Sequence, residues 1–397
     1  MNLNEKIPGA VIRRERLARG IEQKALCEGI CVPSYLSKIE RGLVCPNGEI
    51  TAALYGRLGL EALEGKELKL ADERVDAAYG RVLYNAGVNE AMALLEPLAA
   101  GLVNSPRAAD WLILRGLAAG EDTTRALSDM ADCLTERQRQ QLVILKWKYG
   151  ADRRPEPMRE ACFALGDSFA LNAWAEACYV SADYGEVLRL EEKLTAQALE
   201  EGNTWQLANY YILKGSAYSC LFLEDMMLTY YRRAIHMLQN TGWKHALDDL
   251  YYNIGATMLS LKRFDEAACW FEKMQARDGA LALHKRALLA IRRGDVQEGR
   301  ALIEAMRRCL AADPQTSPAD WLRAEEAEWE CRTDFLESRE YLGLLERLLA
   351  ELGRDYHFGH VTFYQDVYLE ACQRQRQYRK ALEFQRTISE RSVRIIV

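Results

Sequence analysis

A two-helix pattern that recurs along most of the chain is the feature that most limits its fold. In residues 251–274, YYNIGATMLSLKRFDEAACWFEKM, apolar side chains recur at helical spacing on two successive segments. The small residues Gly255 and Ala267 would let the two helices approach closely, and the large apolar residues would fill the space between neighbouring pairs. One such pair cannot bury its apolar faces alone, so the pattern predicts stacked helix pairs.

Equivalent positions recur at a regular interval. In the second helix of each pair these positions are Val187, Met227, Ala267 and Gly299, which are 40, 40 and 32 residues apart. A period in this range is typical of solenoids built from helix pairs. No segment alternates between apolar and polar residues as a strand would, so we expect an all-α protein.

The repeated unit resembles the tetratricopeptide repeat, most closely at residues 251–274. This resemblance extends over about 320 residues, a length that suits a stack of several helix pairs. It implies a tetratricopeptide-like right-handed α-solenoid over residues 81–397, which would bind a ligand and form a dimer.

The first sixty residues read differently, because their predicted helices are short. Gly20 and Gly42 suit helix C-termini, Pro33 suits a first helical turn, and Asn47 can cap the segment that follows it. We therefore predict a compact head domain over residues 1–66. A linker helix over residues 67–80 would join it to the repeats.

The charge is unevenly distributed between these parts. Residues 1–60 hold nine Lys and Arg against six Glu, an excess of +3, whereas the whole chain has a net charge of −6, which leaves −9 for the remainder. A small basic head on a large acidic body favours a nucleic-acid-binding module fused to another domain.

Two of the head's helices fit a helix-turn-helix. QKALCEGI and PSYLSKIER would be the first and second helices, and Leu26, Ile30, Leu36 and Ile39 have the spacing to form their shared core. The outward positions of the second helix would then meet base edges and phosphates. The residues that we expect at the DNA interface are Gln23, Lys24, Pro33, Ser34, Tyr35, Ser37, Lys38 and Arg41.

This head resembles the Xre-type helix-turn-helix family. The residues that carry the resemblance are Arg16, Gln23, Leu26, Ser37, Ile39, Glu40 and Gly42. The resemblance implies that Arg16 and Glu40 form a structural ion pair and that Gln23 holds a DNA phosphate at a helix N-terminus. Glu22 and Val32 depart from the pattern, because they stand where Ser or Thr would cap the two helices.

The turn between these helices, GICVPS, is one residue shorter than is usual in that family. A short turn of this kind is similar to that of the PlcR/PrgX/Rgg group (RRNPP), which joins such a head to a tetratricopeptide-type body. The resemblance implies a quorum-sensing transcriptional regulator that binds double-stranded DNA as a homodimer. It also implies control by a short signalling peptide inside the cell.

A peptide would lie on the concave face formed by the first helix of each pair. Asparagine suits such a site because its amide both donates and accepts hydrogen bonds, and acidic neighbours favour a basic residue or a free amino end. Counting from the small position of each unit, the groove-facing residues are Asn172, Glu176, Asn209, Ser216, Asp249, Asn253, His284, Asp366 and Glu370.

Other functions have weaker support. A tetratricopeptide scaffold that binds a protein partner, with the head bound to DNA constitutively, stays open as the alternative. GDSF at residues 166–169, and His357 and His360 near Asp355, are isolated signals without a catalytic or metal-binding constellation, so we expect neither an enzyme nor a cofactor. Cys27 and Cys31 lack a histidine partner for zinc.

The eleven cysteines are scattered singly within helical patterns, as is typical of reduced thiols. No apolar run is long enough to span a membrane, and the N-terminus lacks an apolar signal core. We therefore expect a cytoplasmic protein without a membrane partner.

Overall fold

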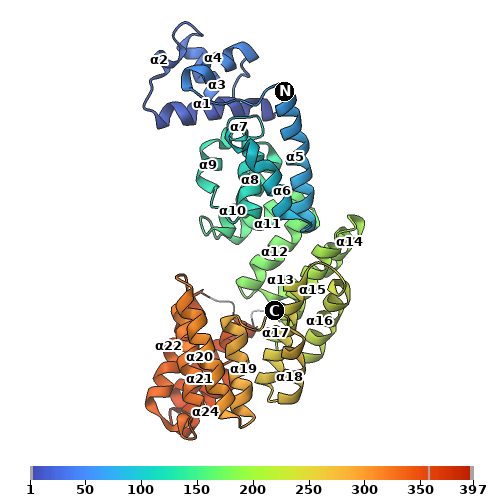
Figure 1. The fold of residues 1–397 in the computed structure, drawn as a ribbon, viewed down its shortest axis with the longest axis vertical. Helices are drawn as coiled ribbons and strands as arrows, with labels where there is room; N and C mark the ends of the chain where they lie inside the picture. Colours follow the sequence, from blue (N-terminus) through green and yellow to red (C-terminus); the bar gives the residue numbers. More distant parts are fainter. Residues whose placement is uncertain (1–2, 356–357, 394–397) are drawn as a thin grey trace. The chain divides into compact units, whose positions relative to one another are not determined.

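The computed structural model describes residues 3–355 and 358–393. Within these ranges every regular element is a helix and there is no strand, which confirms the predicted all-α class. The chain divides into two compact units, Met1–Trp174 and Ala175–Val397 (Figure 1). This division does not follow the boundaries expected from the sequence, so the ranges 1–66, 67–80 and 81–397 stay a prediction about functional parts. No helix in the described ranges is long and apolar enough to cross a membrane.

Unit 1 contains the head and the first helices of the body. Its helices are η1 (Leu3–Lys6), α1 (Ile7–Ala18), α2 (Gln23–Cys27), α3 (Pro33–Glu40), α4 (Gly48–Leu58), α5 (Gly65–Tyr84), α6 (Val88–Leu95), η2 (Glu96–Leu98), α7 (Ala99–Leu102), α8 (Ala108–Ala118), α9 (Thr124–Asp129), η3 (Ala131–Cys133), α10 (Glu136–Lys148) and α11 (Pro155–Leu165). Helix α12 (Ser168–Val180) crosses into unit 2.

Unit 2 continues with helix pairs. Its helices are α13 (Tyr184–Arg189), α14 (Glu191–Glu200), α15 (Thr204–Cys220), α16 (Glu224–Leu238), α17 (Lys244–Ser260), α18 (Phe264–Lys273), α19 (Ala280–Arg292), α20 (Val296–Ala312), α21 (Pro318–Glu330), η4 (Phe335–Glu337), α22 (Arg339–Asp355), α23 (Gly359–Thr362), α24 (Gln365–Arg374) and α25 (Tyr378–Val393).

The local signals of the head produce the expected helix ends, with one exception. The Asn47 side chain accepts a hydrogen bond of 2.9 Å from the backbone N–H of Ile50 and so caps α4. Gly20 and Gly42 adopt left-handed φ angles of 65° and 64° directly after α1 and α3. The predicted helix over residues 23–30 is too long, because α2 ends at Cys27 and Gly29 turns the chain with a φ of 71°.

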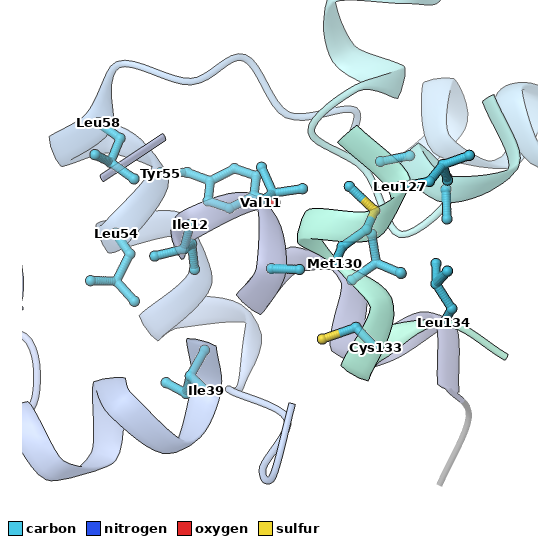
Figure 2. Close-up of a cluster of buried hydrophobic side chains, with 14 of the residues drawn as sticks. Val11, Ile12, Ile39, Leu54, Tyr55, Leu58, Leu127, Met130, Cys133 and Leu134 are labelled. Atoms are coloured by element: carbon cyan, nitrogen blue, oxygen red, sulfur yellow. The ribbon is translucent and has the colours of Figure 1, made fainter. Parts of the chain in front are cut away.

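The core of the head is continuous with that of the next helices. Leu26, Leu36 and Ile39 are fully buried in one apolar cluster, as their spacing predicted, and Ile30 packs against it half-buried. The same cluster contains side chains from α8, α9, η3 and α10. In Figure 2 the side chain of Met130 lies near Val11, beside the head.

The predicted linker segment is part of a long, packed helix. The side chains of Ala71, Val75 and Ala78 on α5 are fully buried, and they form a second apolar cluster with Leu95 of α6 and Trp111 of α8. Because α5 contributes to a core, it holds the chain in place between the head and the first helices of the body.

In unit 2 the predicted small positions do bring paired helices together. A Cβ atom on Gly215 of α15 would lie 2.4 Å from the ring of Tyr231 on α16, and one on Gly255 of α17 would lie 2.5 Å from the ring of Phe271 on α18. Both glycines are therefore needed for close packing. The second-helix positions Met227 and Ala267 are fully buried as well. The unit is consistent with the expected α-solenoid of helix pairs (Figure 1).

Candidate functional sites in the head and the helical body

Three polar side chains are joined beneath the exposed surface of the head. The Arg16 guanidinium donates to both carboxylate oxygens of Glu40, from Nε at 2.6 Å and from Nη2 at 2.9 Å. Gln23 donates from Nε2 to the same Glu40 carboxylate at 2.7 Å. Arg16 and Glu40 are buried, and the hydrogen bonds that Arg16 and Gln23 donate to Glu40 link α1, α2 and α3 within the head.

The side chain of Gln23 is therefore bonded within the head. The resemblance implied that Gln23 holds a phosphate, but its amide nitrogen is directed to Glu40. Neither α2 nor α3 has a side-chain cap at Glu22 or Val32, in line with the departures noted in the sequence. A phosphate contact by Gln23 would have to use the second N–H of this amide or the backbone N–H, because the side-chain oxygen only accepts hydrogen bonds.

The turn between α2 and α3 is held from α4. Arg57 donates from Nη1 to the backbone carbonyl oxygens of Leu26 at 2.9 Å and Glu28 at 2.5 Å. Cys27 is buried in the apolar core, and burial raises the pKa of the Cys31 thiol. Within the described residues no group of three or more potential ligands is arranged to hold a metal ion.

The surface of α3, the second helix of the helix-turn-helix, carries most of the residues that we expect to contact DNA. Lys24 of α2, Pro33, Ser34 and Lys38 of α3, and Arg41 just after α3, are exposed. Tyr35, Ser37 and Gln23 are half-buried, and Tyr35 also packs against the head's apolar core. The arrangement places basic and hydroxyl groups together on one accessible helix, where they can contact phosphates and base edges.

A cavity of about 530 Å³ lies among helices of unit 2. Its walls come mainly from α15 and α17, which are first helices of their pairs, with further residues from α16, α19 and the segment Gly359–Phe363 that includes α23. Three residues expected in the groove, Ser216, Asp249 and Asn253, line it. Its size lies within the usual range for ligand pockets, and its lining combines aromatic, aliphatic and polar groups.

The other expected groove residues lie elsewhere. Asn172 is buried in unit 1, Glu176 is exposed on α12, and Asn209 is half-buried on α15 outside the cavity lining. Asp366 and Glu370 of α24 line a different, polar pocket of about 550 Å³ together with Lys262.

His284 does not face the groove. It is fully buried, and its Nε2 lies 3.3 Å from the Glu326 carboxyl and 3.5 Å from the Tyr364 hydroxyl. Burial lowers the pKa of His284 well below its usual value and raises that of Glu326 well above its own. Both shifts favour a neutral imidazole beside a protonated carboxyl. The other carboxyl oxygen of Glu326 accepts a hydrogen bond of 3.2 Å from Tyr341.

Glu330, about one turn after Glu326 on α21, has a pKa shifted in the opposite direction. Glu330 accepts two hydrogen bonds from Arg292, at 2.6 and 2.9 Å. Burial opposes ionisation of Glu330, but the charge and hydrogen bonds of Arg292 lower its pKa below the ordinary value. One turn of α21 thus carries a neutral and an ionised carboxyl side by side.

Lys285 is one of the cavity residues that the sequence pattern did not identify. It lies on α19 beside His284, lines the cavity, and is only 5% exposed. Its ammonium nitrogen lies 2.8 Å from the centre of the Phe363 ring and 5.4 Å from that of Tyr364. A shift of one residue in the assumed helix phase would have selected Lys285 in place of His284.

The isolated enzyme-like signals lie in ordinary structural positions. Gly166 ends α11 with a left-handed φ of 72°, and Ser168 is buried at the start of α12. His360 lies 3.1 Å from the Arg323 guanidinium, and His357 lies outside the described residues.

Comparison with protein families supports the assignment of the head. Residues 12–59 match the helix-turn-helix family model, a match that covers α2, α3, α4 and most of α1. The match supports a DNA-binding regulator for the head, followed by an all-helical body. No curated protein matches the chain, and no solved structure matches it.

Proposed function

We propose that this protein is a sequence-specific transcriptional regulator whose DNA binding is controlled by a short intracellular peptide held in the cavity of unit 2. The observation that carries the proposal is that cavity, because Ser216, Asp249 and Asn253 line it from the first helices of successive pairs. Hydroxyl, carboxyl and amide groups on these helices offer both donors and acceptors to a peptide backbone.

The head would act in a homodimer. One short recognition helix reads few base pairs, so two heads on paired half-sites multiply specificity. Ser34, Tyr35 and Ser37 of α3 would contact the major groove, while Lys24, Lys38 and Arg41 would contact phosphates. Arg16 and Glu40 would position the recognition helix from beneath.

Control by the peptide requires two conformations of the protein. A ligand shifts their populations only as far as it binds one conformation better than the other. A peptide in the cavity would contact α15, α17 and α19 at once, so it would favour the spacing of these helices that fits it. A change in that spacing along the body would then alter the geometry of the dimer on DNA.

The test combines DNA selection with peptide addition. Full-length protein is used to select sequences from a random double-stranded DNA pool at low salt, and the selected site is then titrated with and without synthetic peptides. The peptides come from the C-terminal ends of small reading frames beside the gene. Light scattering gives the number of chains per particle.

The expected result is a pseudo-palindromic site, a dimer, and an apparent DNA affinity that at least one peptide changes several-fold. The variant with Ser34, Tyr35 and Lys38 all replaced by Ala is expected to lose the sequence preference while keeping its helix content. Sequence preference without any peptide effect would favour the alternative, a scaffold bound to DNA constitutively. The absence of sequence preference would overturn the proposal.

A further inference from the structure

A buried lysine lines the cavity of unit 2 without an ion pair among the described residues. Lys285 projects from α19 into the cavity lining, and it is more than nine-tenths buried. Among the described residues its ammonium forms no hydrogen bond and no ion pair, and its close neighbours are the faces of Phe363 and Tyr364. Ring faces attract a cation, but they do not accept its three N–H donors as oxygen atoms would.

The surroundings lower the pKa of Lys285 well below its usual value. Burial disfavours the charged form most, and Arg323 and Arg292 disfavour it further, against a smaller opposing effect of Glu326 and Glu330, neither of which forms an ion pair with Lys285. Both arginines already have acidic partners, Glu330 and Asp320 respectively. A buried charge without a counter-ion favours binding of an anion at the position that the charge faces.

The second buried lysine of this unit shows what a satisfied site looks like. Lys214 on α15 is 2% exposed, yet its ammonium is paired with the Glu191 carboxylate and lies 4.3 Å from the centre of the Tyr230 ring. It is absent from the cavity lining. Of these two buried lysines, the one that lines the cavity is the one without a protein carboxylate.

We propose that Lys285 is the anchor for a ligand carboxylate, so that the cavity selects short peptides whose free C-terminal carboxylate or acidic side chain reaches the wall formed by α19 and Phe363. This inference rests on the proposed function and adds the ligand chemistry. The ammonium would donate to the carboxylate oxygens in a charge-assisted hydrogen bond, shielded from water by the walls of the cavity. Ser216, Asp249 and Asn253 would contact the remainder of the peptide.

The experiment uses four synthetic pools of randomised heptapeptides with the full-length protein. The pools have a C-terminal free acid or a C-terminal amide, and each form is made with and without Asp and Glu in the mixture. Bound peptides are separated by size exclusion and quantified by mass spectrometry. The same pools are applied to Lys285→Met and to Lys285→Gln, with thermal melts to show which variants fold, and to Lys214→Met as a buried-lysine control.

The expected result is that the unsubstituted protein retains the carboxylate-bearing pools at least tenfold over the amidated pool that lacks Asp and Glu. A preference for the free acid identifies the C-terminus as the source, and a preference for Asp and Glu identifies the side chain. Each folded Lys285 variant loses the preference, whereas the Lys214 variant keeps it.

Equal recovery of all four pools by the unsubstituted protein would overturn the carboxylate site and leave the peptide cavity standing. Persistence of the preference in a Lys285 variant would overturn the assignment to this residue. Recovery of no peptide from any pool would overturn the peptide-binding function together with this inference.

Discussion

Arg16 and Glu40, which lie 24 positions apart in the chain, are held face to face by hydrogen bonds of 2.6 and 2.9 Å in the interior of the head. Such a pair is costly to break from one side, because the remaining charge stays buried. We expect Arg16→Met to lower the free energy of unfolding of the head by about 3–5 kcal/mol. Equilibrium denaturation monitored by circular dichroism measures the loss.

The double variant Arg16→Met, Glu40→Leu is the control for this prediction. Replacing both charges with apolar groups removes the uncompensated carboxylate, so most of the lost stability is expected to return. The exposed pair of Glu136 and Arg139 gives a second comparison, because Glu136→Gln should change stability little. A single Arg16 variant as stable as the unsubstituted protein would contradict the structural role of the pair.

Lys38 should contribute to DNA binding through charge alone. It is exposed on α3, and a phosphate contact by its ammonium releases about one counter-ion from the DNA. Lys38→Ala is therefore expected to weaken binding to specific and random DNA alike and to reduce the slope of log K against log salt by about 1. Fluorescence anisotropy over a range of salt concentrations checks this.

The matched control for Lys38 is Lys244→Ala, since Lys244 is exposed at the start of α17 in unit 2. This substitution also removes one positive charge, but from a site that is not on the recognition helix. An equal reduction of the salt slope in both variants would contradict a phosphate contact by Lys38, because the effect would then follow the protein's net charge and not the position of the lysine.

Gly255 illustrates a packing requirement that opposes helix propensity. Alanine at this position would gain up to about 1 kcal/mol of helix propensity. However, its methyl group would lie 2.5 Å from the Phe271 ring, and overpacking of this kind costs about 1–3 kcal/mol. We expect Gly255→Ala to lower the melting temperature.

Gly343 is the comparison for Gly255, because it lies within α22 and a Cβ atom there would meet nothing within 4 Å. Gly343→Ala should raise the free energy of unfolding by about 0.5–1 kcal/mol. If both alanine variants were stabilising, α17 and α18 would not pack as closely as the structure indicates.

The sequence predicted the parts of these sites that depend on local signals. The cap at Asn47, the left-handed turns at Gly20 and Gly42, and the apolar spacing of the head each act over a few residues. The helix over residues 23–30 was predicted too long, because Gly29 adopts a left-handed φ and Arg57, from α4, binds the backbone carbonyls of the turn.

The groove was predicted only in part, for a physical reason. Helical phase correctly places Ser216, Asp249 and Asn253 in the cavity lining. An error of one residue in the assumed phase rotates a side chain by about 100°, and for this reason His284 was predicted in the groove where Lys285 lies. The segment Gly359–Phe363 reaches the cavity from far along the chain, and no periodic pattern specifies such a return. Phe363, which covers Lys285, could therefore not be found from the sequence.

Glu326 and Glu330 should respond to the same substitution with opposite pH dependence. The raised pKa of Glu326 means that the native state keeps a proton that the unfolded chain loses above about pH 4.5. The stability that this carboxyl contributes therefore falls as pH rises. Since Gln imitates the protonated form, Glu326→Gln should be near neutral at pH 5 and increasingly stabilising, relative to the unsubstituted protein, toward pH 9.

For Glu330 the sign is reversed. Its lowered pKa contributes stability that is present above about pH 4.5 and lost as pH falls. Glu330→Gln leaves Arg292 without its counter-ion and should cost about 3 kcal/mol at pH 7, with a smaller cost at acid pH. Urea titrations from pH 4 to 9 test both variants, and pH profiles of the same sign would contradict the assigned charge states.

The groups that face Glu326 and Glu330 have to be in the same protonation state in both proteins of a comparison, because several of them carry charge or titrate. They are Lys285, Arg292, Arg323, Tyr341, His284, Tyr364 and His360. Each variant is therefore compared with the unsubstituted protein at the same pH, so that their contributions cancel to first order.

Lys285→Met should stabilise the protein in the absence of any ligand. The substitution keeps an unbranched side chain of similar length and removes a buried ammonium that has no acidic partner among the described residues. We expect a gain of about 1–2 kcal/mol at pH 7, since an unpaired buried charge costs more than the cation–π contact returns. Lys214→Met is expected to destabilise the protein, because it leaves Glu191 without its partner.

The gain from Lys285→Met should also shrink as pH rises. The pKa of Lys285 is well below 10.5 in the folded protein, so between that lowered value and 10.5 the unfolded chain binds a proton that the native state does not. The unsubstituted protein therefore becomes more stable with rising pH in this window, by at most about 1.4 kcal/mol per pH unit for one proton. Denaturant midpoints of the two proteins should converge as pH rises toward 10.5, and a constant difference, or a Lys285 variant less stable at every pH, would show that the ammonium is already neutralised within the protein.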